Sequence, residues 1–197
     1  MIQKEKLESL YVRERKSMQD IANILGCSLH KVKYWMEKQD VKARSISDAI
    51  YLKCNPHGDP FHIKEVKTLN EAKLLGLGLG LYWGEGNKKN KNSIRLGNTD
   101  PEIIKNFIRF LTVIFGIDTS RLKFGLQIFS DMPGEKILRF WIDKLKEFHV
   151  SRKQFFKITV TPHRGVGNYK EKSKTGVLTV YFGNVKLKKF LDGMLPR

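Results

Sequence analysis

The chain has 197 residues, 41% of them hydrophobic, and Lys and Arg outnumber Asp and Glu by 37 to 20, which gives a net charge of +17. No apolar run approaches the roughly 18 residues of a membrane span, and the charged N-terminus has no apolar signal region, so we expect neither a membrane protein nor a secreted one. Two cysteines are too few for a disulfide framework, and the positive charge favours a polyanionic partner, so we expect a cytoplasmic, nucleoid-associated protein that binds nucleic acid.

Short helices are predicted at the N-terminus, over residues 4–14, 18–25 and 29–38. Ser17 is placed to cap the second helix, and Gly26 supplies the turn before the third. Two short helices joined by a tight glycine turn form the helix-turn-helix arrangement.

The apolar positions of this region agree with that arrangement. The residues expected to point inward are Ile21, Leu25, Cys27, Val32 and Trp35. The segment closely resembles the helix-turn-helix family of DNA readers, in which the outer face of the second helix of the pair enters the major groove. A plain helical hairpin that mediates protein contacts is the alternative.

The next part of the chain is read as a connection between two domains. Residues 41–47 carry Lys42 and Arg44, and two roles stay open for them: contact with the DNA backbone or minor groove, or a solvated linker. Residues 52–66 contain Asn-Pro, Gly and Pro turn signals. We therefore expect a helix-turn-helix domain at 1–49, a linker at 50–69 and a second domain at 70–197.

Residues 74–86 alternate Leu and Gly, which by itself suits either a strand or a helix. Helical patterns on both sides favour the helix. Gly76, Gly80 and Gly84 then lie along one stripe, where a second helix can approach closely. Each interior glycine costs about 1 kcal/mol relative to alanine, so close packing is expected to compensate.

The rest of the chain alternates between both kinds of element, which predicts an α+β domain. Strands are expected at 93–98, 121–129, 155–161 and 177–182. A capping box at Thr99–Glu102 opens a helix that stops at Gly116, and further helices follow at 133–148 and after Asn184. The natural architecture is an antiparallel sheet covered by helices on one face.

The other face of that sheet is expected to carry basic and hydrogen-bonding side chains with few acids, a composition that suits a DNA groove. A solvated face is the alternative. Together with the outer face of the helix-turn-helix and the basic loop after the third strand, the residues expected to contact DNA are Ser28, His30, Lys31, Lys33, Tyr34, Arg44, Arg95, Arg121, Lys123, Lys157, Thr159, His163 and Arg164.

Residues 78–86, GLGLYWGEG, resemble the nine-residue motif of the LAGLIDADG homing endonucleases. Gly80 and Leu81 match the central Gly-Leu of that motif, Gly84 its small position, Glu85 its metal-binding acid and Gly86 its closing glycine. The family usually has aspartate where this chain has Glu85. The likeness spans residues 70–197 and implies a LAGLIDADG-type α/β domain with a saddle-shaped antiparallel sheet.

The resemblance also implies a mechanism. Two motif helices pack together through their small residues, each delivers one acid, and the acids hold Mg²⁺ beside two phosphates. The chain has a single copy of the motif, so it would act as a homodimer through the helix at 76–86. The implied interface residues are Gly76, Gly80, Trp83 and Gly84, and the implied catalytic residues are Glu85, as metal ligand, with Gln127 and Lys157 in support.

The function expected from the resemblance is that of a site-specific, Mg²⁺-dependent endonuclease that cuts double-stranded DNA. The alternative is a helix-turn-helix transcription regulator whose LAGLIDADG-type domain binds DNA without cutting it. RNA is a less favoured partner. The acid at Glu85 is the sequence feature that favours the enzyme over the regulator.

Overall fold

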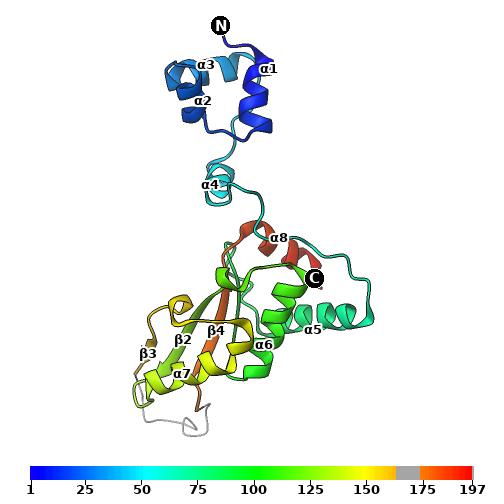
Figure 1. The fold of residues 1–197 in the computed structure, drawn as a ribbon, viewed down its shortest axis with the longest axis vertical. Helices are drawn as coiled ribbons and strands as arrows, with labels where there is room; N and C mark the ends of the chain where they lie inside the picture. Colours follow the sequence, from blue (N-terminus) through cyan, green and yellow to red (C-terminus); the bar gives the residue numbers. More distant parts are fainter. Residues whose placement is uncertain (163–173, 197) are drawn as a thin grey trace. The chain divides into compact units, whose positions relative to one another are not determined.

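The chain divides into two units, Met1–Asp59 and Pro60–Arg197, in the computed structural model, which describes residues 1–162 and 174–196 (Figure 1). The division falls inside the predicted linker. None of the described helices is long and apolar enough to cross a membrane.

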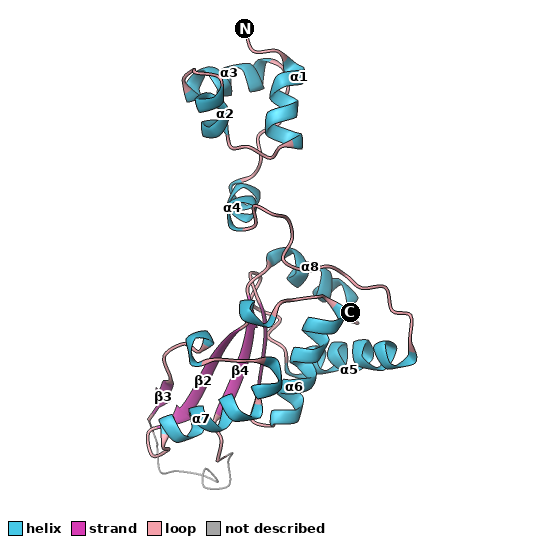
Figure 2. Cartoon of the chain, in the orientation of Figure 1, coloured by secondary structure: helices cyan, strands magenta, loops and turns pink. Residues whose placement is uncertain are grey.

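The N-terminal unit consists of helices (Figure 2). They are α1 (Lys4–Leu7), which continues into the π-helical segment η1 (Glu8–Arg13), then α2 (Met18–Ile24), α3 (Leu29–Lys38) and α4 (Ile46–Cys54). Side chains of the first four segments form one apolar cluster, in which Ile21 and Val32 are fully buried. Leu25, Cys27 and Trp35, also predicted to point inward, are only partly buried at its edge.

Local capping explains why α2 and α3 begin where the sequence predicts. The Ser17 hydroxyl accepts from the Asp20 backbone N–H and the Asp20 carboxylate accepts from the Ser17 N–H, a full capping box. Ser28 caps α3 by accepting from the Lys31 N–H. Gly26 joins the two helices with a φ of +58°, a left-handed conformation that glycine adopts without strain.

The predicted linker at 50–69 differs from the structure at both ends. Ser45 accepts from the Asp48 N–H and starts helix α4, where the sequence indicated irregular chain. At the other end the chain packs on the second unit: the His62 N–H donates to the Phe115 carbonyl and the Lys64 N–H to that of Ile114. The sequence did not predict helix α4 or these backbone hydrogen bonds, because the turn residues of this segment indicated a linker.

The C-terminal unit is a mixed α+β structure. Its main elements are α5 (Leu69–Glu85), β1 (Ile94–Asn98), α6 (Pro101–Arg109), η2 (Phe110–Ile114), β2 (Lys123–Phe129), α7 (Gly134–Lys144), β3 (Thr159–Thr161), β4 (Val177–Phe182) and α8 (Val185–Met194), with short 3-10 turns at Thr119–Arg121, Lys146–Phe148 and Arg152–Gln154. Asp100, rather than Thr99, caps α6, and Pro101 occupies its first turn. Asn184 caps α8 as predicted.

The four strands form one sheet in the order β1-β4-β2-β3. β1 and β2 both run antiparallel to β4, but β3 runs parallel to β2, so the prediction of a purely antiparallel sheet was wrong. The third strand is also shorter than predicted, because only Phe155 makes a bridge before Thr159, to Phe124. A helix and a long connection separate β2 from β3, which permits a parallel return.

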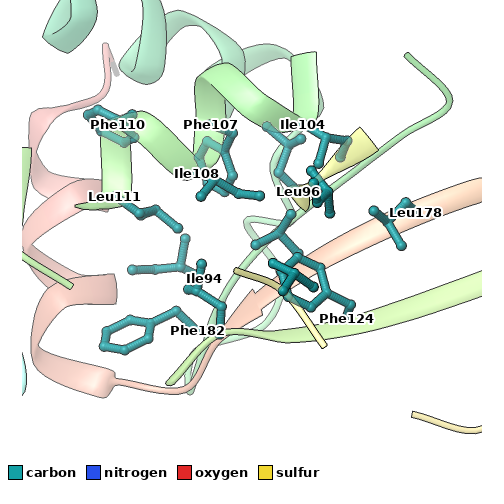
Figure 3. Close-up of a cluster of buried hydrophobic side chains, with 14 of the residues drawn as sticks. Ile94, Leu96, Ile104, Phe107, Ile108, Phe110, Leu111, Phe124, Leu178 and Phe182 are labelled. Carbon is teal, nitrogen blue, oxygen red and sulfur yellow. The ribbon is translucent and has the colours of Figure 1, made fainter. Parts of the chain in front are cut away.

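One face of the sheet is buried under helices. Alternate residues such as Leu96, Phe124 and Val180 point into a core shared with Phe107 and Leu111 (Figure 3). The core also takes side chains from α7 and α8. The residues between them in each strand are exposed or partly exposed, so the second face is open among the described residues, as the alternation predicted.

Candidate functional site

The candidate site is built around helix α5, which confirms the helix predicted from the patterns on both sides of the Leu-Gly alternation. Thr68 and Glu71 form a capping box at its start. At Gly78, α5 packs against the ring of Phe110 so closely that a Cβ on this residue would overlap the ring. The buried ring of Tyr82 lies stacked near Phe107. These contacts hold one face of α5 on the core.

The opposite face of α5 has no packing partner among the described residues. A Cβ at Gly76, Gly80 or Gly84 would meet no atom within 4 Å. Trp83 is 56% exposed and Leu77 46% exposed on the same helix. Within the part of the chain that the structure describes, these three glycines have no role in packing, and they leave one side of α5 without side chains at these positions.

Glu85 is the last residue of α5, with an exposed side chain. The next residue is held firmly: the Gly86 N–H donates to the Tyr82 carbonyl, and Gly86 pairs with Leu96 at the edge of β1. A Cβ at Gly86 would overlap the Tyr82 ring, so only glycine allows this turn. The backbone thus fixes Glu85 beside the β1 edge of the sheet.

A basic loop follows Glu85 directly. Lys88 donates from Nζ to the Trp83 carbonyl, and Lys89 and Lys91 are exposed. Asn90 orders the loop by accepting from the backbone N–H groups of Asn92 and Ser93, at 2.9 Å each. Lys88 is the cation nearest to Glu85 in sequence, and sequence reasoning missed it as a site residue, although the run NKKNKNS carried the signal.

A buried polar network lies beneath α5. The Tyr82 hydroxyl donates to Asp192 Oδ1 at 3.1 Å, and Lys188 donates to both oxygens of the same carboxylate at 2.5 Å. Lys188 is only 1% exposed. Burial raises the pKa of Tyr82 above its usual range, and the Asp192 carboxylate raises it further. The network ties α8 to the turn of α5 that carries Glu85.

The open sheet face presents three rows of side chains across β1, β4 and β2. Arg95 lies opposite Tyr181, which lies opposite Lys123, and the Arg95 guanidinium is 5.2 Å from the centroid of the Tyr181 ring. The side chains of the next row rise little above the sheet, because Thr179 lies between two glycines, Gly97 and Gly125. The last row contains Gln127, with Val177 on one side and Thr159 on the other. The open face therefore combines cations with hydrogen-bonding groups.

The structure does not bring the three predicted catalytic residues together within one chain. Glu85 adjoins the β1 edge, whereas Gln127 lies on β2 and Lys157 is exposed just before β3, at the other edge. Gly86 and Gln127 are three strand spacings and three residues apart, about 14 Å across the sheet and about 10 Å along it. In a single chain, Gln127 belongs with the open face, and Lys157 lies in the exposed segment before β3.

Other predicted DNA contacts fall in different settings. Arg121 ends a 3-10 turn just before β2 and is exposed. His163 and Arg164 lie outside the described residues. In the N-terminal unit, His30, Lys31, Lys33 and Tyr34 are exposed on α3, and the Ser28 side chain caps that helix.

Arg44, predicted to contact DNA, is held inside the N-terminal unit. Its guanidinium lies 4.0 Å from the centroid of the Tyr11 ring and donates from Nη1 to the Lys16 carbonyl at 3.0 Å. Its backbone N–H donates to the Tyr11 hydroxyl. These contacts give Arg44 a structural role in joining the segment after α3 to η1.

No group of three or more His, Cys, Asp or Glu side chains among residues 1–162 and 174–196 is arranged to hold a metal ion. Mg²⁺ can bind with fewer than three protein ligands, because it keeps several waters and binds through one or two carboxylates together with substrate phosphates. The exposed Glu85 carboxylate at the negative end of a helix dipole fits such a partial site. One carboxylate, that of Glu85, does not complete the coordination of a metal ion by protein ligands.

Compared with known proteins, the chain matches no family model, no curated protein and no solved structure.

Proposed function

We propose that this protein is a site-specific, Mg²⁺-dependent endonuclease that cuts double-stranded DNA as a homodimer. The observation that carries the proposal is the position of Glu85, an exposed carboxylate at the end of a helix whose outer glycine stripe contacts none of the described residues. The net charge of +17 and the open polar sheet face support DNA as the substrate.

The dimer follows from the exposed face of α5. Glycines at 76, 80 and 84 lower helix stability by about 1 kcal/mol each relative to alanine, and no contact with residues 1–162 or 174–196 compensates for that loss. A second copy of α5 crossing on this stripe could approach closely, because the glycines have no Cβ atoms. The contact would bury Trp83 and Leu77. A twofold axis there would bring two Glu85 carboxylates to the same side of the dimer.

The residues around the axis then have separate tasks. Each Glu85 would hold Mg²⁺ against one scissile phosphate, while the lysines of the loop at 88–91 neutralise neighbouring phosphates. When bound, Mg²⁺ supplies Lewis-acid stabilisation of the phosphate charge and lowers the pKa of a bound water. The Tyr82–Asp192–Lys188 network would hold the last turn of α5, which carries Glu85, on α8.

The sheet and α3 would select the target. Lys123 on the open face, and Lys31 and Lys33 on α3, would contact phosphates, and Arg95 on the open face would contact base edges. Two such surfaces in one chain, doubled in a homodimer, suit a long target sequence. A long target is what an enzyme that cuts few places in a genome needs.

The test starts from duplexes that the full-length protein retains from a randomised pool. The retained DNA is incubated with Mg²⁺ and wild-type, Glu85→Gln or Glu135→Gln protein. Glu135 is a matched control because it is an exposed glutamate on another helix, α7. We expect double-strand cuts with the wild type and Glu135→Gln, and none with Glu85→Gln.

The same experiment separates the enzyme from the regulator. Specific retention of DNA without any Mg²⁺-dependent cut by the wild type would replace the endonuclease with a DNA-binding regulator. Retention of RNA in preference to duplex DNA, measured by competition in the same buffer, would contradict both.

A further inference from the structure

The row of the open sheet face that contains Gln127 has a composition of its own. Gln127 is exposed on β2, Val177 lies directly opposite it on β4, and Thr159 lies beside it on β3. Val177 is an apolar side chain with 37% exposure beside the polar Gln127. Both side chains are exposed, so a ligand on the open face can reach the pair.

The amide of Gln127 makes a hydrogen bond to the neighbouring strand β3. Its Nε2 donates to Thr161 Oγ1 at 3.0 Å, and Thr161 is itself held because its carbonyl accepts from the Ser130 N–H. One N–H of the amide is therefore used, and among the described residues the second N–H and the oxygen Oε1 have no hydrogen-bond partner, so both can meet a ligand. Thr161 lies on β3, and Val177 lies on β4, on the other side of Gln127.

A donor and an acceptor side by side match one base edge in the major groove. Adenine presents the N7 acceptor next to the N6 amino donor, whereas guanine presents two acceptors and cytosine a donor alone. Thymine presents an acceptor and a methyl group. A phosphate offers acceptors only and would leave Oε1 facing negative charge. The pinned amide thus selects adenine.

The order of groups across the sheet also matches the paired base. Across the major-groove edge of an A·T pair the groups run adenine N7, adenine N6, thymine O4 and thymine methyl. Across the sheet the amide of Gln127 is followed by the methyl groups of Val177 on the next strand, where the Cβ atoms of paired residues lie about 5 Å apart. The same placement therefore sets an apolar side chain against the thymine methyl.

We propose that Gln127 and Val177 together recognise one A·T base pair through its major-groove edge, with Thr161 as the residue that orients Gln127. The inference rests on the proposed binding of duplex DNA and holds equally for an enzyme and for a regulator. In a homodimer the base pair occurs twice, once in each half of the target, in inverted orientation.

The experiment has two stages and uses the full-length protein. Duplexes retained from a randomised pool are sequenced for the wild type and for Gln127→Ala, Thr161→Val and Lys123→Ala. We expect a symmetric pair of positions at which the wild type prefers adenine by about tenfold. Gln127→Ala should accept all four bases there and keep its preferences elsewhere, and Thr161→Val should show a weakened preference at the same positions.

Lys123→Ala is the matched control, because Lys123 lies on the same strand and face as Gln127. It should lower affinity for every sequence without changing any base preference, as expected of a phosphate contact.

The second stage changes single atoms of the selected site. Replacing the adenine by 7-deazaadenine removes N7, and replacing the paired thymine by uracil removes the methyl group. Wild-type affinity should fall about tenfold with the first change and about fourfold with the second. Gln127→Ala should be insensitive to the first change and Val177→Ala to the second.

Two results would overturn the inference, for different reasons. If the wild type selects a defined site but Gln127→Ala selects the same bases, the assignment of Gln127 is wrong while DNA binding stands. If the wild type retains no duplex above the level of an unrelated protein, the proposed function fails and the assignment fails with it.

Discussion

At the scale of single residues, the buried charge of Lys188 is stabilised by one carboxylate, that of Asp192. Lys188 is 1% exposed and pairs with Asp192, whose side chain is 40% exposed. Removing Asp192 leaves a buried ammonium without its counter-ion, so Asp192→Ala should lower the free energy of unfolding by about 3 kcal/mol. Lys188→Met removes the buried charge and leaves a carboxylate that water can reach, so it should cost about 1 kcal/mol or less.

Urea unfolding at neutral pH measures both variants. The order of the two losses is the informative result, since it depends on which partner is buried. Equal losses, or a larger loss for Lys188→Met, would contradict the burial that the structure assigns to Lys188.

At the scale of elements, α5 contains glycines of two kinds. Gly78 packs against Phe110, so Gly78→Ala should destabilise the fold by about 2 kcal/mol or more. Gly80 faces open space, so Gly80→Ala should raise the stability of the monomer by up to about 1 kcal/mol. Thermal unfolding at a concentration below dimer formation compares the two directly.

Gly80→Ala should also weaken the proposed dimer, because a Cβ would hold the second α5 helix away. Sedimentation measures this as a shift from dimer to monomer at a given concentration. A variant that is more stable as a monomer and dimerises as well as the wild type would argue against the glycine stripe as the interface.

The start of α5 provides a prediction about pH. A hydrogen bond from Lys64 and others from the backbone N–H groups of Lys67 and Thr68 lower the pKa of Glu71 to about 2, from 4.5. A carboxyl group whose pKa is lowered by folding stabilises the fold above its unfolded value and loses that contribution as pH falls toward the folded value.

Glu71→Gln should therefore melt at a lower temperature than the wild type at pH 7, and the difference should shrink as the pH falls from about 4.5 to about 2. Melting curves across that range measure the effect. A difference that stays constant with pH would mean that the Glu71 charge is not responsible for it.

At the scale of the whole molecule, the boundary at Asp59 separates two units with their own cores. Residues 60–197 should fold alone. Residues 70–197, which match the boundary predicted from the sequence, should be less stable, because they lack the contacts of Phe61, His62 and Lys64 with the core and with Ile114 and Phe115. Thermal unfolding of the two fragments measures the contribution of residues 60–69, and equal melting temperatures would contradict it.

The sequence predicted most elements because their signals are local. The caps at Ser17, Ser28 and Asn184 and the alternation in β4 need no knowledge of distant residues. The direction of β3 depends on how a long connection returns to the sheet, and no local pattern encodes that. For the same reason the separation of Glu85 from Gln127 could not be predicted, since it is set by strand order.

The central claim is that two copies of Glu85, one from each protomer, each cut one strand of the target. A supercoiled plasmid carrying the selected site tests it with Mg²⁺ and three protein samples. Wild-type protein should give linear plasmid, and Glu85→Gln should leave the plasmid supercoiled. Dimers re-formed from equal amounts of the two proteins should also give a nicked product, because a mixed dimer has one Glu85. Linear product from Glu85→Gln at the wild-type rate, or plasmid left intact by the wild type, would contradict the claim.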